Sequence, residues 1–315
     1  MIISASRRTD IPAFYSEWFV NRLRAGYLLT RNPFNAHQVS KVSLLPEDVT
    51  AIVFWTRNPT PLMKHLKEID RSGYRYYFQY TITGYPKILE TSVPRPHRAL
   101  ETFSKLSDLV GANRVIWRYD PVLLSAKMDM DEHKRLFVKI ADSLASKTRR
   151  VVVSFADLYT KVNRNLAKVD QLQPWDIVEH RDKLSELAFF FSKTAGERGL
   201  EIQSCAEDVD LSKEGIEHGK CIDDQLIGSV LKVESDHAKD KGQREACGCV
   251  KSVDIGMYNT CLHGCAYCYA TANKSLALKN HEKHDPNSPF LIGQPKDTDQ
   301  VKTVEGKGPI QETLF

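Results

Sequence analysis

The chain has 315 residues, of which 42% are hydrophobic and 27% are charged, and its formal net charge is +4. This composition is typical of a globular protein with a substantial core, and it excludes a disordered or collagen-like chain. No apolar run is long enough to span a membrane, and the N-terminus lacks the pattern of a signal peptide. We therefore expect a cytoplasmic protein with no membrane partner.

Short apolar segments alternate with longer amphipathic segments along the chain. The predicted strands are Ile2–Ala5, Ala51–Trp55, Arg75–Ile82, Arg114–Trp117, Arg150–Phe155, Leu200–Ser204 and Ser252–Ile255. The predicted helices are Glu17–Ala25, Pro61–Ser72, Arg98–Val110, Asp131–Ala145 and Trp175–Arg198. Strands that alternate with helices of this length predict βα units around a parallel sheet. The expected fold is α/β, a TIM-like (β/α) barrel that is partial and permuted.

Polar residues follow most of the predicted strands. In a parallel barrel the carboxyl ends of the strands build the active site, so these residues are expected to converge on one rim. Each acidic residue among them could instead cap a following helix or turn. The candidate catalytic residues, which would line a cavity for substrate, are Arg7, Arg8, Asp10, Arg57, Arg118, Asp120 and Asp157.

All seven cysteines lie after residue 200, and three of them stand in the run T-C-L-H-G-C-A-Y-C-Y-A. Cys261, Cys265 and Cys268 have the spacing C-x3-C-x2-C. In a cytosolic chain such a group indicates metal or redox chemistry rather than disulfides. Three thiolates can bind a cubane iron–sulfur cluster and leave its fourth iron without a protein ligand. The alternative is a zinc knuckle, although its paired C-x2-C elements are absent from this run.

The same run resembles the cluster loop of the radical S-adenosylmethionine (SAM) superfamily, including the aromatic Tyr267 before the third cysteine. The resemblance implies a [4Fe–4S] cluster whose open iron is chelated by the methionine group of SAM. It also implies an external reductant protein and cleavage of SAM to a 5′-deoxyadenosyl radical. Tyr267 and Tyr269 would then shield the cluster or pack its loop. In most members the loop follows the first barrel strand, whereas here it follows the last.

Three stretches resemble an uncharacterised family, a domain of unknown function. They are S-A-S-R-R-T-D-I-P near the start, W-R-Y-D-P in the middle and D-I-G-x-Y-N-T-C-x-x-G-C-x-Y-C-Y-A near the end. The resemblance extends from residue 1 to about residue 275 and implies a cluster-binding barrel with no known substrate. The chain is more distantly similar to spore photoproduct lyase and other photolyase-like radical SAM enzymes, which implies a role like DNA repair.

Four further cysteines fit a second metal site. Cys205 ends a predicted strand, and Cys221, Cys247 and Cys249 lie between that strand and the cluster loop. Four thiolates could hold an auxiliary iron–sulfur cluster or a zinc ion. Alternatively, Cys205 and Cys221 are small buried hydrophobic residues, as free cysteines often are.

The expected organisation is a barrel body over residues 1–245, a cluster-binding segment over 246–280 and a flexible tail over 281–315. The tail composition predicts little fixed structure. Its last residues, Gln311–Phe315, resemble the bacterial sliding-clamp-binding peptide, in which Leu314 and Phe315 would enter an apolar pocket. The alternative is that these two side chains pack on the chain's own barrel.

Two other function classes stay open on the sequence. The chain could be a non-catalytic, metal-stabilised nucleic-acid-binding or adaptor protein in which strand-end arginines grip phosphates. The aromatic residues that would stack on bases are Trp55, Tyr80, Trp117 and Tyr119. It could also be an iron–sulfur electron carrier, which needs neither SAM nor a cavity.

Overall fold

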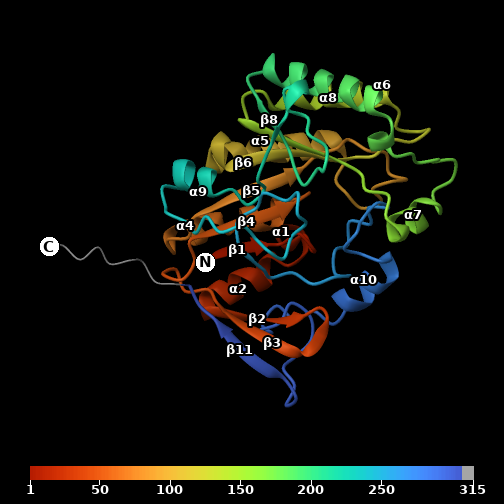
Figure 1. Ribbon diagram of the computed structural model, residues 1–315. Coiled ribbons are helices and arrows are strands. Elements are labelled where there is room, and N and C mark those ends of the chain that lie inside the picture. The colour runs from red at the N-terminus through yellow and green to blue at the C-terminus, as the bar shows by residue number, and fades with distance from the viewer. Residues whose placement is uncertain (307–315) are drawn as a thin grey trace.

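The computed structural model describes residues 1–306 and has a mixed α/β fold built on an eight-stranded parallel sheet (Figure 1). The strands lie in the order β10-β1-β4-β5-β6-β7-β8-β9, so the strand of this sheet that comes last in the sequence pairs with the one that comes first. Their bounds are β1 (Ile2–Ala5), β4 (Ala51–Thr56), β5 (Tyr76–Thr81), β6 (Val115–Val122), β7 (Arg150–Phe155), β8 (Glu201–Ser204), β9 (Glu217–His218) and β10 (Val253–Asp254). The predicted parallel sheet of alternating strands and helices is confirmed.

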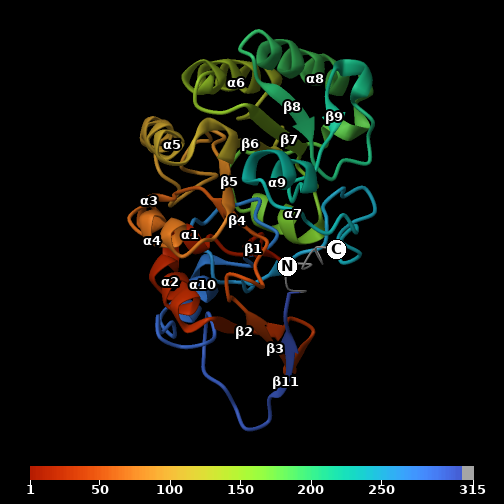
Figure 2. The same cartoon turned by 90° about the vertical axis from the view of Figure 1, so that its left-hand side faces the viewer.

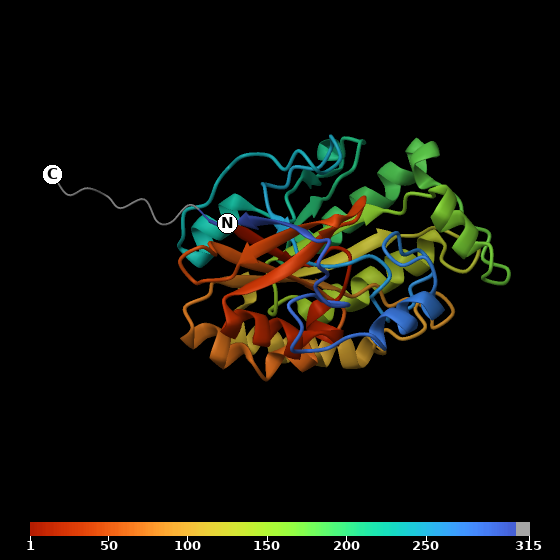
Figure 3. The ribbon, with the colours of Figure 1, turned by 90° about the horizontal axis from the view of Figure 1, so that it is seen from below.

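Both faces of the sheet are covered, which explains the continuous apolar runs in its strands. The helices are α1 (Ile11–Phe14), α2 (Ser16–Ala25), α3 (Thr60–Met63), α4 (Leu66–Arg71), α5 (Pro96–Val110), α6 (Met130–Leu144), α7 (Thr160–Leu166), α8 (Arg181–Gly196), α9 (Asp224–Leu231) and α10 (Lys274–His281). Seen from below, the red-to-gold helices of the first third of the chain lie along one side of the sheet (Figure 3). Phe137 of α6 stacks on Phe191 of α8 with their ring centroids 4.4 Å apart.

The other face of the sheet carries α9 and the cysteine-containing segments that flank it (Figure 2). Leu226, Ile227 and Leu231 of α9 pack with Val53 and Tyr77, which point to this face from β4 and β5. Asp223 caps the helix by accepting hydrogen bonds from the backbone N–H groups of residues 225 and 226. This second, smaller core also includes Ile2 of β1, Ile116 of β6 and Val152 of β7.

The expectation of a flexible tail from residue 281 is wrong for the part that the structure describes. A strand, β11 (Gln300–Val304), pairs in parallel with β3 (Asn35–Ser43), which forms a hairpin with β2 (Tyr27–Asn32). The segment before β11 is also fixed, since Trp18 Nε1 donates a hydrogen bond to the carbonyl of Ser288 at 2.9 Å. The hairpin of β2 and β3 provides the strand with which β11 pairs, and the composition of the tail does not indicate this partner. The clamp-binding prediction for Gln311–Phe315 lies outside the described residues.

Two predicted helices are shorter than expected. The segment Pro61–Ser72 is divided into α3 and α4 because the N–H of His65 bonds to the carbonyl of Leu62, a tighter turn than that of an α-helix. The segment Trp175–Arg198 becomes helical only at Arg181, since the N–H of Trp175 bonds to the carbonyl of Leu124 and holds the chain against the loop after β6.

No helix within residues 1–306 has both the length and the apolar character that a membrane crossing requires.

Candidate metal centre

Parallel pairing of β10 with β1 fixes where the C-x3-C-x2-C loop begins. Ser4 and Asp254 are register partners, and the N–H of Ile255 donates to the carbonyl of Ser4 at 3.0 Å. The Asp254 carboxylate then accepts hydrogen bonds from Ser6 Oγ at 2.6 Å and from the N–H of Arg7 at 2.8 Å. The loop therefore leaves the sheet at the carboxyl ends of the strands.

Ion pairing also stabilises the contact between Asp254 of β10 and the segment that follows β1. Arg8 Nε donates to Asp254 Oδ1 at 3.0 Å. Burial opposes ionisation of Asp254, but Arg8 and the hydrogen bonds from Ser6 and Arg7 keep the pKa of its carboxyl below the usual value. Gly256 follows directly, and a Cβ there would lie 2.0 Å from Ser6 Oγ, so only glycine fits this close approach.

Cys261, Cys265 and Cys268 lie in one compact loop and are each half-buried. The N–H of Cys268 donates to the carbonyl of Cys265 at 3.1 Å, which turns the chain between these two cysteines. Gly264 has φ +66°, and a Cβ there would lie 2.3 Å from Thr91 Oγ1. The turn that presents the second cysteine therefore depends on glycine.

The segment after β5 forms hydrogen bonds with one side of the loop. The N–H of Ala266 donates to the carbonyl of Leu89, and the N–H of Ser92 donates to the carbonyl of His263, both at 2.9 Å. Beneath them Glu90 accepts hydrogen bonds from Arg57 Nη1 and from Thr83 Oγ1, both at 2.7 Å.

Tyr267 belongs to the same buried network. Arg57 Nη2 donates to Tyr267 Oη at 2.6 Å, and Tyr267 Oη donates in turn to Glu90. Burial raises the pKa of the Tyr267 hydroxyl well above its ordinary value. The Tyr267 hydroxyl therefore joins the loop to the Arg57–Glu90 ion pair, and the expected role of this residue beside a cluster stays a prediction.

His263 and Asp10 hold the loop from the other side. His263 Nε2 lies 2.7 Å from Asp10 Oδ2, and both side chains are at least 95% buried. Asp10 also accepts hydrogen bonds from the N–H of Ala13, as the cap of α1, and from the N–H of Arg57. One carboxylate thus joins α1, the end of β4 and the cysteine loop.

The surroundings of two loop thiols, Cys261 and Cys265, raise their pKa values. Burial first, and then the nearby Asp10 carboxylate, raise the pKa of Cys261 to about 12. Burial raises the pKa of Cys265 well above its ordinary value, although Arg57 opposes that rise. A bound metal cation reverses this balance, because it deprotonates the thiols that coordinate it.

Soft thiol donors in one loop fit an iron–sulfur cluster. Among residues 1–306 no group of three or more His, Cys, Asp or Glu side chains is arranged to hold a metal ion. A cubane binds each thiolate at a different iron, so its ligands need not converge on one point. His263 Nδ1 and Thr271 Oγ1, both buried at this loop, have no hydrogen-bond partner in the described part of the chain.

The four other cysteines come together on the α9 side of the sheet. Cys205 Sγ and Cys221 Sγ are 2.7 Å apart, and Arg118 Nη1 donates to Cys221 Sγ at 2.6 Å. Hydrogen bonding to Cys221, opposed by burial and assisted by Arg118, lowers the pKa of Cys205. Hydrogen bonds from Cys221 and Cys247 lower the pKa of Cys249. These four side chains, Cys205, Cys221, Cys247 and Cys249, are called the cysteine quartet below.

The predicted strand-end residues divide between these two centres. Asp10 and Arg57 contact the cysteine loop, whereas Arg118 pairs with Asp120 and reaches the quartet. Arg7 and Arg8 lie between the centres, around Asp254. The remaining candidates are at the surface: Asp157 pairs with Arg244, and the half-exposed Tyr269 donates a hydrogen bond from its hydroxyl to the carbonyl of Arg7.

The aromatic residues expected to stack on bases are not available for it. Tyr80, Trp117 and Tyr119 are fully buried on the helix-covered face of the sheet. Trp55 is half-buried, and two guanidinium groups contact its ring, with Arg7 at 5.5 Å and Arg118 at 5.1 Å from the ring centroid. Three of the four aromatic rings that the nucleic-acid-binding hypothesis needs for base stacking are therefore inaccessible.

Several residues at the centres were not selected from the sequence. Glu90 lies in a loop without a motif, whereas His263 lies inside the cysteine run itself. Asp254 carries a signal, since it begins the D-I-G stretch before the cysteines. Glu207 accepts a hydrogen bond from the N–H of Phe155, and burial raises the pKa of its carboxyl to about 8. Its position two residues after Cys205 could have marked it.

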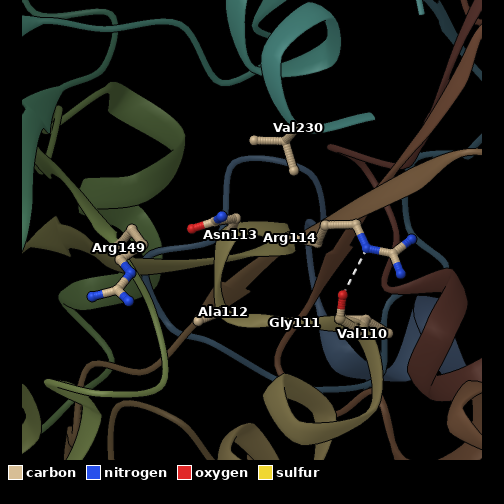
Figure 4. Close-up of a pocket in the computed structure, with 7 residues that line it drawn as sticks. All are labelled: Val110, Gly111, Ala112, Asn113, Arg114, Arg149 and Val230. Atoms are coloured by element: carbon tan, nitrogen blue, oxygen red, sulfur yellow. Dashed lines mark hydrogen bonds between the residues drawn. The ribbon is translucent and has the colours of Figure 1, made fainter. Parts of the chain in front are cut away.

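A pocket of about 380 Å³ lies far from this chemistry, at the amino ends of β6 and β7 (Figure 4). Arg114 Nε donates there to the carbonyl of Val110 at 2.7 Å. The pocket is open to solvent and holds no cysteine or acidic side chain among its lining residues, which are Val110, Gly111, Ala112, Asn113, Arg114, Arg149 and Val230. The pocket and the cysteine loop therefore lie at opposite ends of the parallel strands.

Comparison with known proteins gives one family. Residues 2–270 match the family described as a domain of unknown function, DUF1848. No curated protein matches the chain.

Proposed function

We propose that this chain, which belongs to the DUF1848 family, is a radical SAM enzyme on a partial, permuted (β/α) barrel. The observation that carries the proposal is the placement of the C-x3-C-x2-C loop. It follows β10, which pairs in parallel with β1, so the three thiols lie at the carboxyl end of the sheet. Active sites of parallel α/β proteins lie at that end.

Cys261, Cys265 and Cys268 would hold a [4Fe–4S] cluster, and its open iron would bind SAM. When bound, the cluster supplies the electron that cleaves SAM to methionine and a 5′-deoxyadenosyl radical. The chain's own part is to bind, orient and exclude water. The Arg57–Glu90–Tyr267 network and the His263–Asp10 pair fix the loop on both sides, so the thiols are presented without further ordering.

One cation is placed to bind an anionic group near the loop. Arg7 Nη2 is buried and has no hydrogen-bond partner among residues 1–306, while Nη1 of the same guanidinium lies 3.8 Å from Asp240 Oδ2. A guanidinium donor of this kind matches a carboxylate or phosphate oxygen. We assign Arg7 to the carboxylate of SAM or to a phosphate of the substrate. The distant resemblance to photolyase-like enzymes favours DNA as that substrate.

The test is anaerobic. The full chain is reconstituted with iron and sulfide, then supplied with dithionite and SAM, and 5′-deoxyadenosine is measured by mass spectrometry. Product is expected from the unmodified chain and from Lys279→Ala, an exposed change on α10. Cys261→Ala, Cys265→Ala and Cys268→Ala should each abolish it, because each removes one iron ligand.

Two outcomes contradict the proposal. Iron and sulfide that load fully and are reduced, but give no 5′-deoxyadenosine, would leave an electron carrier. Product that is undiminished in Cys261→Ala would place the chemistry elsewhere. Isothermal titration of SAM onto the loaded and metal-free chain separates these results, since the enzyme should bind SAM only when loaded.

A further inference from the structure

The cysteine quartet lies on segments that adjoin the two end strands of the sheet. β9 and β10 are the end strands of the eight-stranded sheet. Cys221 follows β9 by three residues, and Cys249 precedes β10 by four. Cys205 comes directly after β8, and its N–H donates to the carbonyl of Val153 on β7. A group that joins these thiols would therefore connect both edges of the sheet.

Hydrogen bonds already hold the three segments in place. Tyr77 Oη and Gln79 Nε2, both from β5, donate to the carbonyl of Cys221 at 2.7 and 2.8 Å. The N–H of Val250 donates to the carbonyl of Ile222, and the N–H of Ile222 donates to Cys249 Sγ at 3.3 Å. The two loops that carry Cys221 and Cys249 are thus paired before any metal binds.

Two glycines allow these segments to approach closely. A Cβ on Gly219 would lie 2.7 Å from Gln203 Cβ, and one on Gly248 would lie 3.2 Å from the carbonyl oxygen of Gly219. The backbone around the quartet is therefore built for close approach of three separate segments.

We propose that the quartet is a structural zinc site that ties the two edges of the sheet together. Zinc is bound tetrahedrally by four thiolates at about 2.3 Å, which separates neighbouring sulfurs by about 3.8 Å. The sulfurs of Cys205 and Cys221 lie 2.7 Å apart, and Cys249 Sγ accepts a hydrogen bond from the N–H of Ile222, the residue after Cys221. No three of the described side chains are arranged to hold a metal ion in this structure, so zinc binding would rearrange these thiols, and Cys205 and Cys221 would move about 1 Å further apart.

The surrounding charges suit such a site. Four thiolates around one Zn²⁺ leave two negative charges, and each thiol loses its proton on binding. Arg118 already donates to Cys221 Sγ, and Arg7 lies close enough to interact electrostatically with Cys221, Cys247 and Cys249. Two buried guanidinium groups offset the two charges. The quartet shares no thiol with the loop of the proposed radical chemistry, although Arg7 lies near both centres.

The test measures metals on the full chain purified from a medium that contains both iron and zinc. The triple variant Cys261→Ala, Cys265→Ala, Cys268→Ala, which lacks the loop thiols, should retain about one zinc per chain. Cys221→Ser and Cys249→Ser should lose it. Because these serine variants can fail to fold, the triple variant is also loaded with Co²⁺. Thiolate-to-cobalt charge-transfer absorption with the visible bands of a tetrahedral ion is expected.

Three results overturn the inference. The triple variant could contain iron and sulfide in place of zinc, which would make the quartet an auxiliary cluster. It could contain no metal and a mass lower by two hydrogens, which would make Cys205 and Cys221 a disulfide. It could bind cobalt without the tetrahedral thiolate spectrum, which would place the ion elsewhere. None of them bears on whether the loop cysteines cleave SAM.

Discussion

Asp10 and His263 are separated by 253 residues in the sequence, and their side chains lie 2.7 Å apart. This contact fastens the cysteine loop to the first helix of the chain. The carboxylate is already engaged by two backbone N–H groups, so the histidine completes its set of partners.

Removing the histidine should loosen the loop without disturbing the sheet. His263→Ala deletes a buried hydrogen bond to a carboxylate, which costs about 1.5–3 kcal/mol. We expect a lower urea midpoint and weaker retention of iron by the purified chain. His37→Ala, at an exposed hairpin position, is the control and should match the unmodified chain. Equal midpoints for the two variants would show that the pair does not anchor the loop.

Glu90 should matter more for stability than a surface carboxylate. Glu90→Ala leaves the Arg57 guanidinium buried without its partner, a change that costs about 3–5 kcal/mol in other buried pairs. The double variant Glu90→Leu with Arg57→Met should be less destabilised than Glu90→Ala, because no charge is left unpaired. Urea denaturation of the metal-free chain measures both.

The matched control for that prediction is the exposed pair of Arg24 and Glu68. Glu68→Ala should change the free energy of unfolding by less than about 1 kcal/mol. A cost for Glu90→Ala as small as the cost for Glu68→Ala would contradict the assigned role of the buried network.

Two glycines should respond oppositely to alanine. Gly256→Ala places a Cβ against Ser6, whose hydroxyl holds Asp254, and overpacking of this kind costs about 1–3 kcal/mol. Gly228→Ala lies on the exposed face of α9 with nothing within 4 Å, and should stabilise the chain by about 0.5–1 kcal/mol. Thermal unfolding should therefore shift in opposite directions. A shift in the same direction for both variants would falsify the close-approach argument at Gly256.

His133 should give the chain an acid-sensitive stability. It is fully buried between the hydroxyl of Tyr119 and the carbonyl of Leu123, and burial lowers its pKa to about 4. The unfolded chain protonates this histidine near its ordinary pKa of about 6.5, while the folded chain does not. Stability is therefore complete above about pH 6.5 and is lost as the pH falls toward 4, by roughly 3 kcal/mol.

The measurement is urea denaturation at several pH values for the unmodified chain and for His133→Gln, which keeps a donor and an acceptor but does not titrate. The difference between the two chains should shrink or reverse as the pH falls. A difference that is constant from pH 7 to pH 4 would exclude a buried neutral histidine.

The main sheet was readable from the sequence because its strands are short apolar runs that end in polar residues. The hairpin of β2 and β3 was not, since its strands are largely polar and the small sheet is completed only by β11, about 260 residues later. Phe290 illustrates the difficulty: it is buried beneath Arg31 although the sequence around it has the composition of a flexible segment.

The sequence allowed the residue types at the two centres to be predicted, but not which of these residues contact one another. The C-x3-C-x2-C run and the arginines at strand ends are visible in the sequence. Arg57 contacts the loop and Arg118 contacts the quartet. Which centre each arginine reaches depends on the face of the sheet on which its side chain lies. Along β5, Tyr77 and Gln79 point to one face of the sheet and Phe78 to the other. Because both faces are mostly apolar, the sequence shows no alternation of polar and apolar residues from which the face of a side chain could be predicted.

The neighbour of the first strand is among the last parts of the chain to be made. Ile3 pairs with Val253, so one edge of β1 stays open while some 250 residues are synthesised. Contacts of such long range are slow to form, and an open edge invites wrong pairing. The cysteine loop follows β10, and therefore it can reach its position only after all the other strands of the main sheet have been synthesised. The proposed metal centre would then be loaded late, into a sheet whose other strands have already assembled.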